Sequence, residues 1–457
     1  MRIHSRRCLL LLTGVVITAC SGAPAPSPEG AEPVGLAIVG ARLIDGTGGT
    51  PVDDSVVLVR DGRIQAAGAR DAVPVPDGAE VVDASGQTII PGLVDLHGHY
   101  GGSIEAAEQA LKNQLYYGVT TTRSIGSDPP DKVALMLEAH AGRADLPRAF
   151  TAGLGFSYPG GFNSSFPNLP TTEDEAREMV RAQAALNVHF TKMWINEVAE
   201  PERKIPPGIR IAIVDESIRN GLVPVAHIDE EADAVQLLEA GLNEFLHSTV
   251  LTFGPGSGAP VDDPEPGQEF VNLCLERDCA FTPTLSIIQN NWHFAELPEL
   301  LEDADLRRVM NPGAFERFSD AETRAGIIEA DNFTDRQAAF RQVQNFVKAI
   351  HDAGIKVALG TDSGTANVPM GWGTHHELEL YVEAGLTPME TLVAATSTGA
   401  SRMPPVGEAD FGTLATGMSA DLVLLDADPL EDISNTLAIN RVMLRGEWVD
   451  RESLLAP

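Results

Sequence analysis

Short segments of alternating apolar and polar residues dominate the chain between Gly35 and Ile90. This alternation has the two-residue period of strands that bury one face, and Asp-Gly and Gly-Gly pairs separate the segments as turns. A similar pattern returns near the C-terminus, over residues 419–449. We therefore expect both ends of the chain to build one small β-sandwich, from residues 34–90 and 401–457.

Between residues 91 and 400, apolar strand-like runs alternate with segments of helical periodicity. This alternation is typical of βαβ units, whose strands form a parallel sheet. The expected strands end near His99, Arg123, Gly153, Lys192, His227, His247, Thr284 and Gly360. Such units predict an α/β fold of the (β/α)8 TIM-barrel type, with its site where the strands end. Residues 286–345, between the last two expected strands, form a segment far longer than one connecting helix requires. We expect a lid or substrate-binding excursion there.

The N-terminal segment has the features of an export signal. A basic start precedes an apolar run over residues 8–19, which is too short to span a bilayer. The run ends in Ile17-Thr-Ala-Cys20, which resembles a bacterial lipobox followed by Ser21. We expect residues 1–19 to be a lipoprotein-type signal peptide and 20–33 a flexible tether. Cys20 would then anchor an exported, periplasm-facing protein to the outer membrane; the alternative is a plain secretory signal.

Cys274 and Cys279 lie in the stretch CLERDC, which has helical character and leads into an apolar strand. A five-residue separation is unfavourable for a disulfide within a helix, and no third sulfur ligand lies nearby for zinc. We therefore expect two buried free thiols.

The composition is ordinary for a globular protein, with 43% hydrophobic and 21% charged residues. The net charge is unusual, because the chain contains 32 Lys and Arg but 65 Asp and Glu, which gives −33. So acidic a chain is repelled by nucleic acid and by anionic lipid surfaces. We expect a small-molecule substrate, no nucleic acid, membrane contact only through Cys20, and a chain compatible with a homo-oligomer.

Strongly polar residues close several of the predicted strands. His97 and His99 are two apart in the strand-ending run LVDLHGH, so they point the same way, about 6–7 Å apart. A polar group at the end of a buried strand is costly unless it is paired or metal-bound. The residues that share this position are His97, His99, Lys192, His227, His247 and Asp362. Together they suit a pair of divalent metal ions, most simply Zn²⁺.

Several motifs resemble the amidohydrolase superfamily, particularly its prolidase-like and imidazolonepropionase-related metal-dependent hydrolases. They include IPGLVDLHGH, GVTTTRSIG, VPVAH, FLHS, LGTDSG and GTLATGMSADLVLLDADPLEDI. The resemblance implies that His97 and His99 bind one metal and that His227 and His247 bind the other. It also implies that Lys192, carboxylated by CO₂, bridges both metals and that Asp362 completes the first site and shuttles protons. The metals would activate a bridging hydroxide.

Alternatives remain open for some of these residues. Lys192 could stay unmodified and pair with a carboxylate, which would leave one metal, and Asp362 could cap a helix. Tyr100 could donate to a tetrahedral oxyanion or simply pack. Arg123 could pair with a substrate carboxylate or form an internal salt bridge. Ser124 stands where family members often carry Asp, so that residue's role is in doubt here.

The resemblance predicts an enzyme that hydrolyses a C–N amide or peptide bond, in an N-acyl amino acid or an Xaa-Pro dipeptide. The same site chemistry would attack a cyclic amide, a lactone or a carbamate. A non-catalytic envelope protein that binds a metal or ligand is a third hypothesis. It ranks last, because all six ligand positions are filled.

Overall fold

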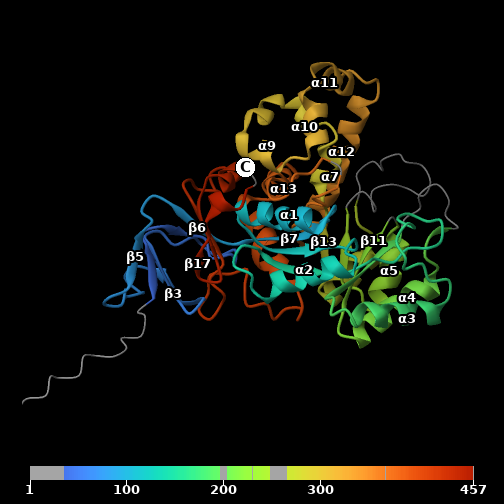
Figure 1. Cartoon of the computed structure of the whole chain (residues 1–457), viewed down its shortest axis with the longest axis horizontal. Helices are drawn as coiled ribbons and strands as arrows, with labels where there is room; N and C mark the ends of the chain where they lie inside the picture. Colours follow the sequence, from blue (N-terminus) through green and yellow to red (C-terminus); the bar gives the residue numbers. More distant parts are fainter. Residues whose placement is uncertain (1–34, 196–202, 229, 248–264, 366, 456–457) are drawn as a thin grey trace, which may run out of the picture.

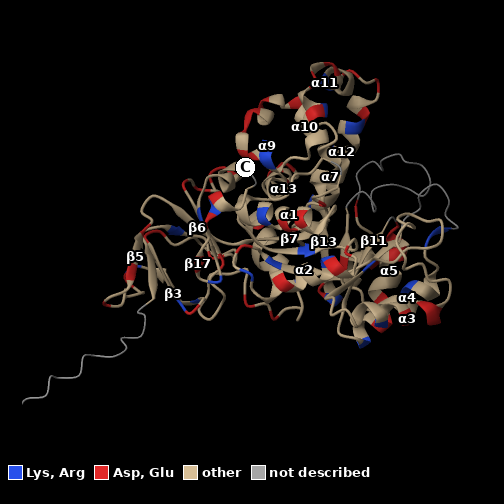
Figure 2. Cartoon of the chain, viewed as in Figure 1, with Lys and Arg blue, Asp and Glu red and all other residues tan. Residues whose placement is uncertain are grey.

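The computed structural model describes residues 35–195, 203–228, 230–247, 265–365 and 367–455 (Figure 1). The predicted signal peptide and tether lie outside the described residues. Within the described ranges, none of the helices has the length and apolar character needed to cross a membrane. Asp and Glu are distributed over both the β-rich and the helical parts rather than gathered on one element (Figure 2).

Two sheets form the β-rich part of the molecule, and one of them joins the two ends of the chain. The first has the order β4-β3-β1-β5, and the second has the order β17-β16-β15-β6-β2. Their bounds are β1 (Leu36–Val39), β2 (Arg42–Leu43), β3 (Ser55–Arg60), β4 (Arg63–Ala69), β5 (Glu80–Asp83), β6 (Thr88–Pro91), β15 (Leu422–Leu425), β16 (Ile439–Leu444) and β17 (Glu447–Trp448). β15 pairs antiparallel with β6, from Leu422 opposite Pro91 to Leu425 opposite Thr88. The apolar faces of both sheets, including Ile38, Val57 and Leu424, share one hydrophobic cluster.

The central part contains the predicted parallel strands in two sheets, ordered β7-β8-β9 and β10-β11-β12-β13-β14. Their bounds are β7 (Leu93–Gly98), β8 (Val119–Ser124), β9 (Arg148–Thr151), β10 (Phe190–Ile195), β11 (Val223–Ile228), β12 (Glu244–Leu246), β13 (Ala280–Thr282) and β14 (Lys356–Val357). Isolated parallel bridges connect the two sheets at both edges, Phe156 with Met193 and Gly98 with Ser363. At the second edge the His99 N–H donates to the Ser363 carbonyl at 2.8 Å.

A helix follows almost every parallel strand. These helices are α1 (Ile104–Tyr116), α2 (Pro130–Ala141), α3 (Glu173–Ala184), α4 (Pro207–Arg219), α5 (Glu231–Ala240), α6 (Gln268–Arg277), α13 (Trp372–Glu383), α14 (Pro388–Val393), η3 (Ala394–Thr398) and α15 (Gly399–Ser401). Local sequence explains where some begin. The Ser103 side chain caps α1, and Thr387 with Glu390 forms a capping box at α14. Two short turns, η4 (Ile433–Leu437) and η5 (Arg451–Ser453), flank the C-terminal strands β16 and β17.

The long segment before β14 is helical. It comprises α7 (Leu285–Gln289), α8 (His293–Glu296), η2 (Pro298–Glu302), α9 (Ala304–Val309), α10 (Pro312–Ser319), α11 (Ala321–Ile328) and α12 (Phe333–Asp352). Helices α9, α10 and α11 project away from the sheets (Figure 1). Their apolar residues, such as Leu306 and Phe318, share a hydrophobic cluster with Trp372 and with residues of α1 and β16. The prediction of an excursion is therefore confirmed, while its role as a lid stays a prediction.

The prediction of two free thiols was wrong, because Cys274 and Cys279 form a disulfide. A helix that included both cysteines would hold them in a geometry unfavourable for a disulfide. In the structure α6 ends at Arg277, and Asp278 adopts a left-handed conformation with φ 53°. That residue turns the chain back, so that the two Cα atoms lie 4.8 Å apart, within the usual disulfide range.

Candidate metal centre

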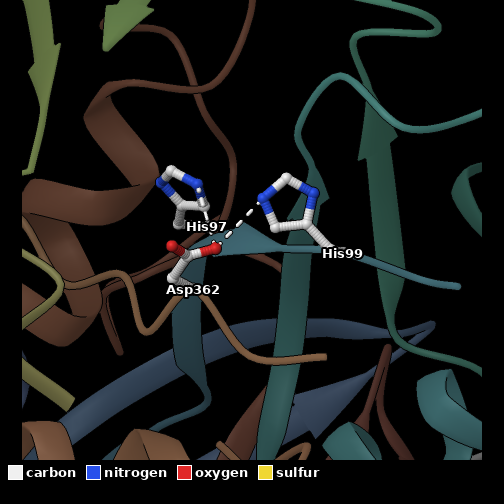
Figure 3. A group of neighbouring side chains, drawn as sticks. All are labelled: His97, His99 and Asp362. Carbon is white, nitrogen blue, oxygen red and sulfur yellow. Dashed lines mark ion pairs between the residues drawn. The ribbon is translucent and has the colours of Figure 1, made fainter. Parts of the chain in front are cut away.

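Three of the predicted ligands meet where the first and last parallel strands end (Figure 3). His97 lies in β7, His99 follows it, and Asp362 comes after β14. The Asp362 Oδ1 atom lies 3.6 Å from His97 Nε2 and 3.0 Å from His99 Nε2. One ligand atom from each of the three residues lies within 4.8 Å of the other two, which is close enough for them to hold one metal ion together.

The two remaining predicted histidines continue this cluster. The His247 ring centroid lies 4.7 Å from that of His97 and 4.2 Å from that of His227. His247 Nδ1 is also 3.9 Å from Asp362 Oδ2. Burial raises the pKa of the Asp362 carboxyl, but the imidazoles of His97, His99 and His247 outweigh it and hold that pKa well below its usual range. Asp362 is therefore available as an anionic ligand.

Lys192 lies in β10 with a fully buried side chain. Burial lowers the pKa of its ammonium group to about 7, so the neutral amine that reacts with CO₂ is accessible near neutral pH. Among the described residues, neither Lys192 Nζ nor either ring nitrogen of His97 has a hydrogen-bond partner. Buried polar atoms without partners are costly, and a metal ion would satisfy one ring nitrogen of His97, while a carbamate on Lys192 would supply oxygens as ligands. The donor set thus fits divalent metal ions.

Backbone geometry at the strand ends is unusual in the way that functional sites often are. His247, Thr284 and Asp362 have φ angles of 74°, 54° and 58°, a region that costs non-glycine residues about 1–3 kcal/mol each. Neighbouring hydroxyls hold two of the rings. Thr284 Oγ1 lies 2.7 Å from His247 Nδ1, and Ser127 Oγ lies 3.2 Å from His99 Nδ1. Such partners fix the orientation of a ligand ring.

Sequence reasoning missed Asp95, which connects the two strands that carry the first metal site. Its buried carboxylate accepts hydrogen bonds from the His97 N–H at 3.0 Å, the Thr361 N–H at 3.1 Å and the Thr361 hydroxyl at 2.8 Å. Gln114 Nε2 donates to it as well, at 3.1 Å. An aspartate inside the apolar run LVDLHGH was the available signal, because a buried carboxylate must find several donors.

The two further predicted catalytic residues, Arg123 and Tyr100, are both buried. The Arg123 guanidinium is fully buried and forms a two-armed ion pair with Glu244, while its Nε donates to the Leu96 carbonyl at 2.7 Å. Pairing with a substrate carboxylate is therefore wrong for Arg123, and the internal salt bridge is correct. Tyr100 is also fully buried, and its hydroxyl lies 2.6 Å from Thr122 Oγ1. The role of Tyr100 as an oxyanion donor stays a prediction, beside the alternative that it packs.

The metal cluster opens into a cavity of about 500 Å³. Its walls are formed by His99, Gly101, Ser127, Phe162, Asn163, Phe166, Trp194, His227, His247, Ile287, Asp362, Gly364 and Thr365. A second cavity of about 460 Å³ shares His99, Gly101 and Gly364 with the first. Space for a small molecule thus lies directly against the cluster.

Parallel strands with helices, and a histidine–aspartate cluster at the strand ends beside a cavity, define a metal-binding enzyme of the α/β class. The chain belongs to the Amidohydrolase family, whose sequence profile matches residues 88–449. It is 27% identical to imidazolonepropionase of Mycolicibacterium smegmatis over 397 residues, which cover 82% of this chain and 85% of that protein. This membership makes it a hydrolase that acts on C–N bonds.

Solved structures agree with the fold. A protein from Bifidobacterium longum assigned as a prolidase superposes with a TM-score of 0.69 at 26% identity, covering 92% of this chain and 97% of its own. Phenylurea hydrolase B also gives a TM-score of 0.69, at 20% identity, with coverage of 92% and 98%. The relatives support a TIM-barrel fold with an additional domain.

Replacing Lys192 tests whether it is carboxylated. We expect Lys192→Gln to lower the metal content from about two to about one ion per chain, because the bridging carboxylate is lost. Protein incubated with ¹³C-bicarbonate should show a carbamate signal that is absent from this variant. Lys112→Gln, at a surface ion pair with Glu108, is the matched control and should keep both the metal and the signal. Unchanged metal content in Lys192→Gln would leave Lys192 an ordinary lysine.

Proposed function

We propose that the protein hydrolyses an amide C–N bond of a small molecule at the metal centre. The observation that carries this proposal is the clustering of His97, His99, His247 and Asp362, of which all but the buried His97 line one cavity. Lys192 is buried nearby, and its Nζ has no hydrogen-bond partner among the described residues. The family supports the class of reaction, and the clustering of these side chains supports the choice of residues.

Two divalent ions, Zn²⁺ in the simplest case, would polarise the substrate carbonyl and activate water at neutral pH. His97, His99 and Asp362 would hold one ion, and His227 and His247 the other, with carboxylated Lys192 between them. Asp362 has a second task, because its carboxylate lines the cavity. There it can accept a proton from the attacking water and return it to the leaving nitrogen.

Removal of the metal tests the proposal most directly. Dialysis against a chelator should abolish amide hydrolysis, and added zinc should restore it, because the polarising charge comes from the ions. Metal content and turnover measured on the same samples should rise together. Full turnover in protein shown to be metal-free would refute the proposal.

The same site chemistry serves other carbonyl compounds, so a cyclic amide, a carbamate or a lactone is the alternative substrate. A hydrolysis screen that pairs linear amides with lactams, carbamates and lactones of matched size separates these possibilities. A protein that binds metal but hydrolyses none of these compounds would instead be a non-catalytic envelope protein.

We also propose that the central strands form a closed eight-stranded barrel and the terminal segments a β-sandwich domain. The bridges at Phe156–Met193 and Gly98–Ser363 support the barrel, since they join the two parallel sheets at both edges. The shared core of the two terminal sheets supports the sandwich.

Export with a lipid anchor at Cys20 is a further part of the proposal. The Cys274–Cys279 disulfide supports it, because such bonds persist mainly in oxidising compartments such as the periplasm. Cells fed a labelled fatty acid should label the wild-type protein and not Cys20→Ser. Labelling of both proteins would place the acyl chain at another residue. Labelling of neither would exclude the lipid anchor.

A further inference from the structure

Among the described residues, the cavity beside the metal cluster has no charged lining outside the cluster itself. Its described lining contains no lysine or arginine, and Asp362 is its only carboxylate. The second cavity, which meets the first at His99, has no charged residue in its described lining. A substrate that extends from the metals into either cavity therefore meets apolar surface, backbone and neutral polar groups.

Several cations of the described chain that lie around the site are engaged with other groups, among them Lys132, which donates to the Tyr100 carbonyl at 2.8 Å. Arg123 is bound to Glu244 inside the protein. Lys192 is buried 5.7 Å from the Trp194 ring centroid, and its conversion to a carbamate would remove its positive charge. Arg203 donates to the Gly160 carbonyl at 3.3 Å and does not line the cavity. The internal segments outside the described residues contain no lysine or arginine in their sequence.

Aromatic side chains form much of the remaining lining. The rings of Phe166 and Trp194 are stacked, with centroids 5.5 Å apart and planes 9° from parallel. The Phe162 ring lies 5.9 Å from that of His227, and Ile287 adds aliphatic surface. Such a wall is complementary to a flat apolar group, and it would leave a carboxylate desolvated without a partner.

We propose that this site selects an uncharged amide that carries an aromatic group, and that it disfavours the N-acyl amino acids and dipeptides expected from the sequence. The inference rests on the proposed amide hydrolysis and names its substrate class. The aromatic group packs against Phe162, Phe166 and Trp194 while the amide carbonyl faces the metals. The net charge of −33 acts in the same direction, because it repels anionic substrates during approach.

Two substrates that differ only in one carboxylate provide the test. N-acetylphenethylamine and N-acetyl-L-phenylalanine share the amide and the phenyl ring, and only the second is anionic. With zinc-loaded full-length enzyme we expect kcat/KM to be at least about tenfold higher for the neutral compound, because the anion has no partner in the cavity. A higher value for N-acetyl-L-phenylalanine would overturn the inference and leave amide hydrolysis intact.

Two variants at one position test whether the lack of a cation on the described cavity wall determines the selectivity. Phe162→Arg places a cation on the cavity wall at a partly exposed position, and Phe162→Gln is the neutral control. The ratio of the two kcat/KM values, neutral over anionic, should fall at least about tenfold in Phe162→Arg relative to Phe162→Gln. Equal ratios in the two variants would show that charge on this wall does not select the substrate.

A binding measurement distinguishes an error in the proposed substrate selectivity from an error in the proposed amide hydrolysis. Calorimetry with zinc-loaded Asp362→Asn protein should show tighter binding of N-acetylphenethylamine than of N-acetyl-L-phenylalanine. If the wild-type enzyme hydrolyses neither compound but this binding order holds, amide hydrolysis fails and the selectivity stands. If the anionic compound binds more tightly, the selectivity is refuted whatever the turnover.

Discussion

Asp362→Asn is expected to retain its bound metal and to lose turnover by about 10³-fold, within the range typical of general acid–base groups. The asparagine side chain has nearly the same shape and keeps one oxygen close to the His97 and His99 nitrogens, which lie 3.6 and 3.0 Å from Asp362 Oδ1. It cannot accept the proton of water or pass one to a leaving nitrogen. The experiment compares kcat with the metal content of the same preparation.

The matched control for this variant is Asp352→Asn. Asp352 is an exposed carboxylate at the end of α12 that pairs with Lys348, and it lines neither of the two cavities beside the metal cluster. It should leave kcat within about twofold, as is usual for a surface substitution. If Asp362→Asn turned over at the wild-type rate with metal bound, Asp362 would be a ligand and nothing more.

Arg123→Ala is expected to lower the free energy of unfolding by about 3–5 kcal/mol, because it leaves the Glu244 carboxylate buried without its partner. Both side chains are almost completely excluded from solvent, and the pair joins β8 to β12 across the interior. Denaturant unfolding measured with and without the substitution gives the value. The double variant Arg123→Met with Glu244→Met should recover much of the loss, since no charge then remains buried.

Arg143→Ala provides the comparison for a surface network. Arg143 binds Glu108 and Asp145 with about a third of its side chain exposed, so its loss should cost less than about 1 kcal/mol. If Arg123→Ala were equally mild, the buried pair would contribute little to stability. A role in substrate binding would then have to be reconsidered.

The clustering of His97, His99 and Asp362 could be predicted from the sequence because the signals are local. His97 and His99 are two residues apart in a strand, and Asp362 follows an apolar run, so strand direction alone places each residue at the same end of the fold. The parallel strands were predicted for the same reason. Their sequence carries both the apolar period and the polar residue that closes the strand.

Other features depend on partners that are distant in sequence, and these were harder to predict. Arg123 forms its ion pair with Glu244, the first residue of β12, which lies 121 residues further along the sequence. No local pattern distinguishes this pair from a substrate-binding arginine. The role of Asp95 depends on the backbone of Thr361 in the same way. The Cys274–Cys279 disulfide was missed because a single left-handed residue, Asp278, decides whether the helix continues.

The pairing of β6 with β15 determines when the metal site can be completed during synthesis. β6 continues into β7 through Gly92 alone, so the strand that carries His97 extends directly from one whose partner is residues 422–425. On a chain made from its N-terminus, that partner emerges after every metal ligand has been produced. The strand that carries His97 thus obtains the β15 partner of its neighbour only when the last tenth of the sequence has been made. An exported chain would have to stay unfolded until its C-terminal strands arrive, and a truncated chain would lack a stable base for the first ligand strand.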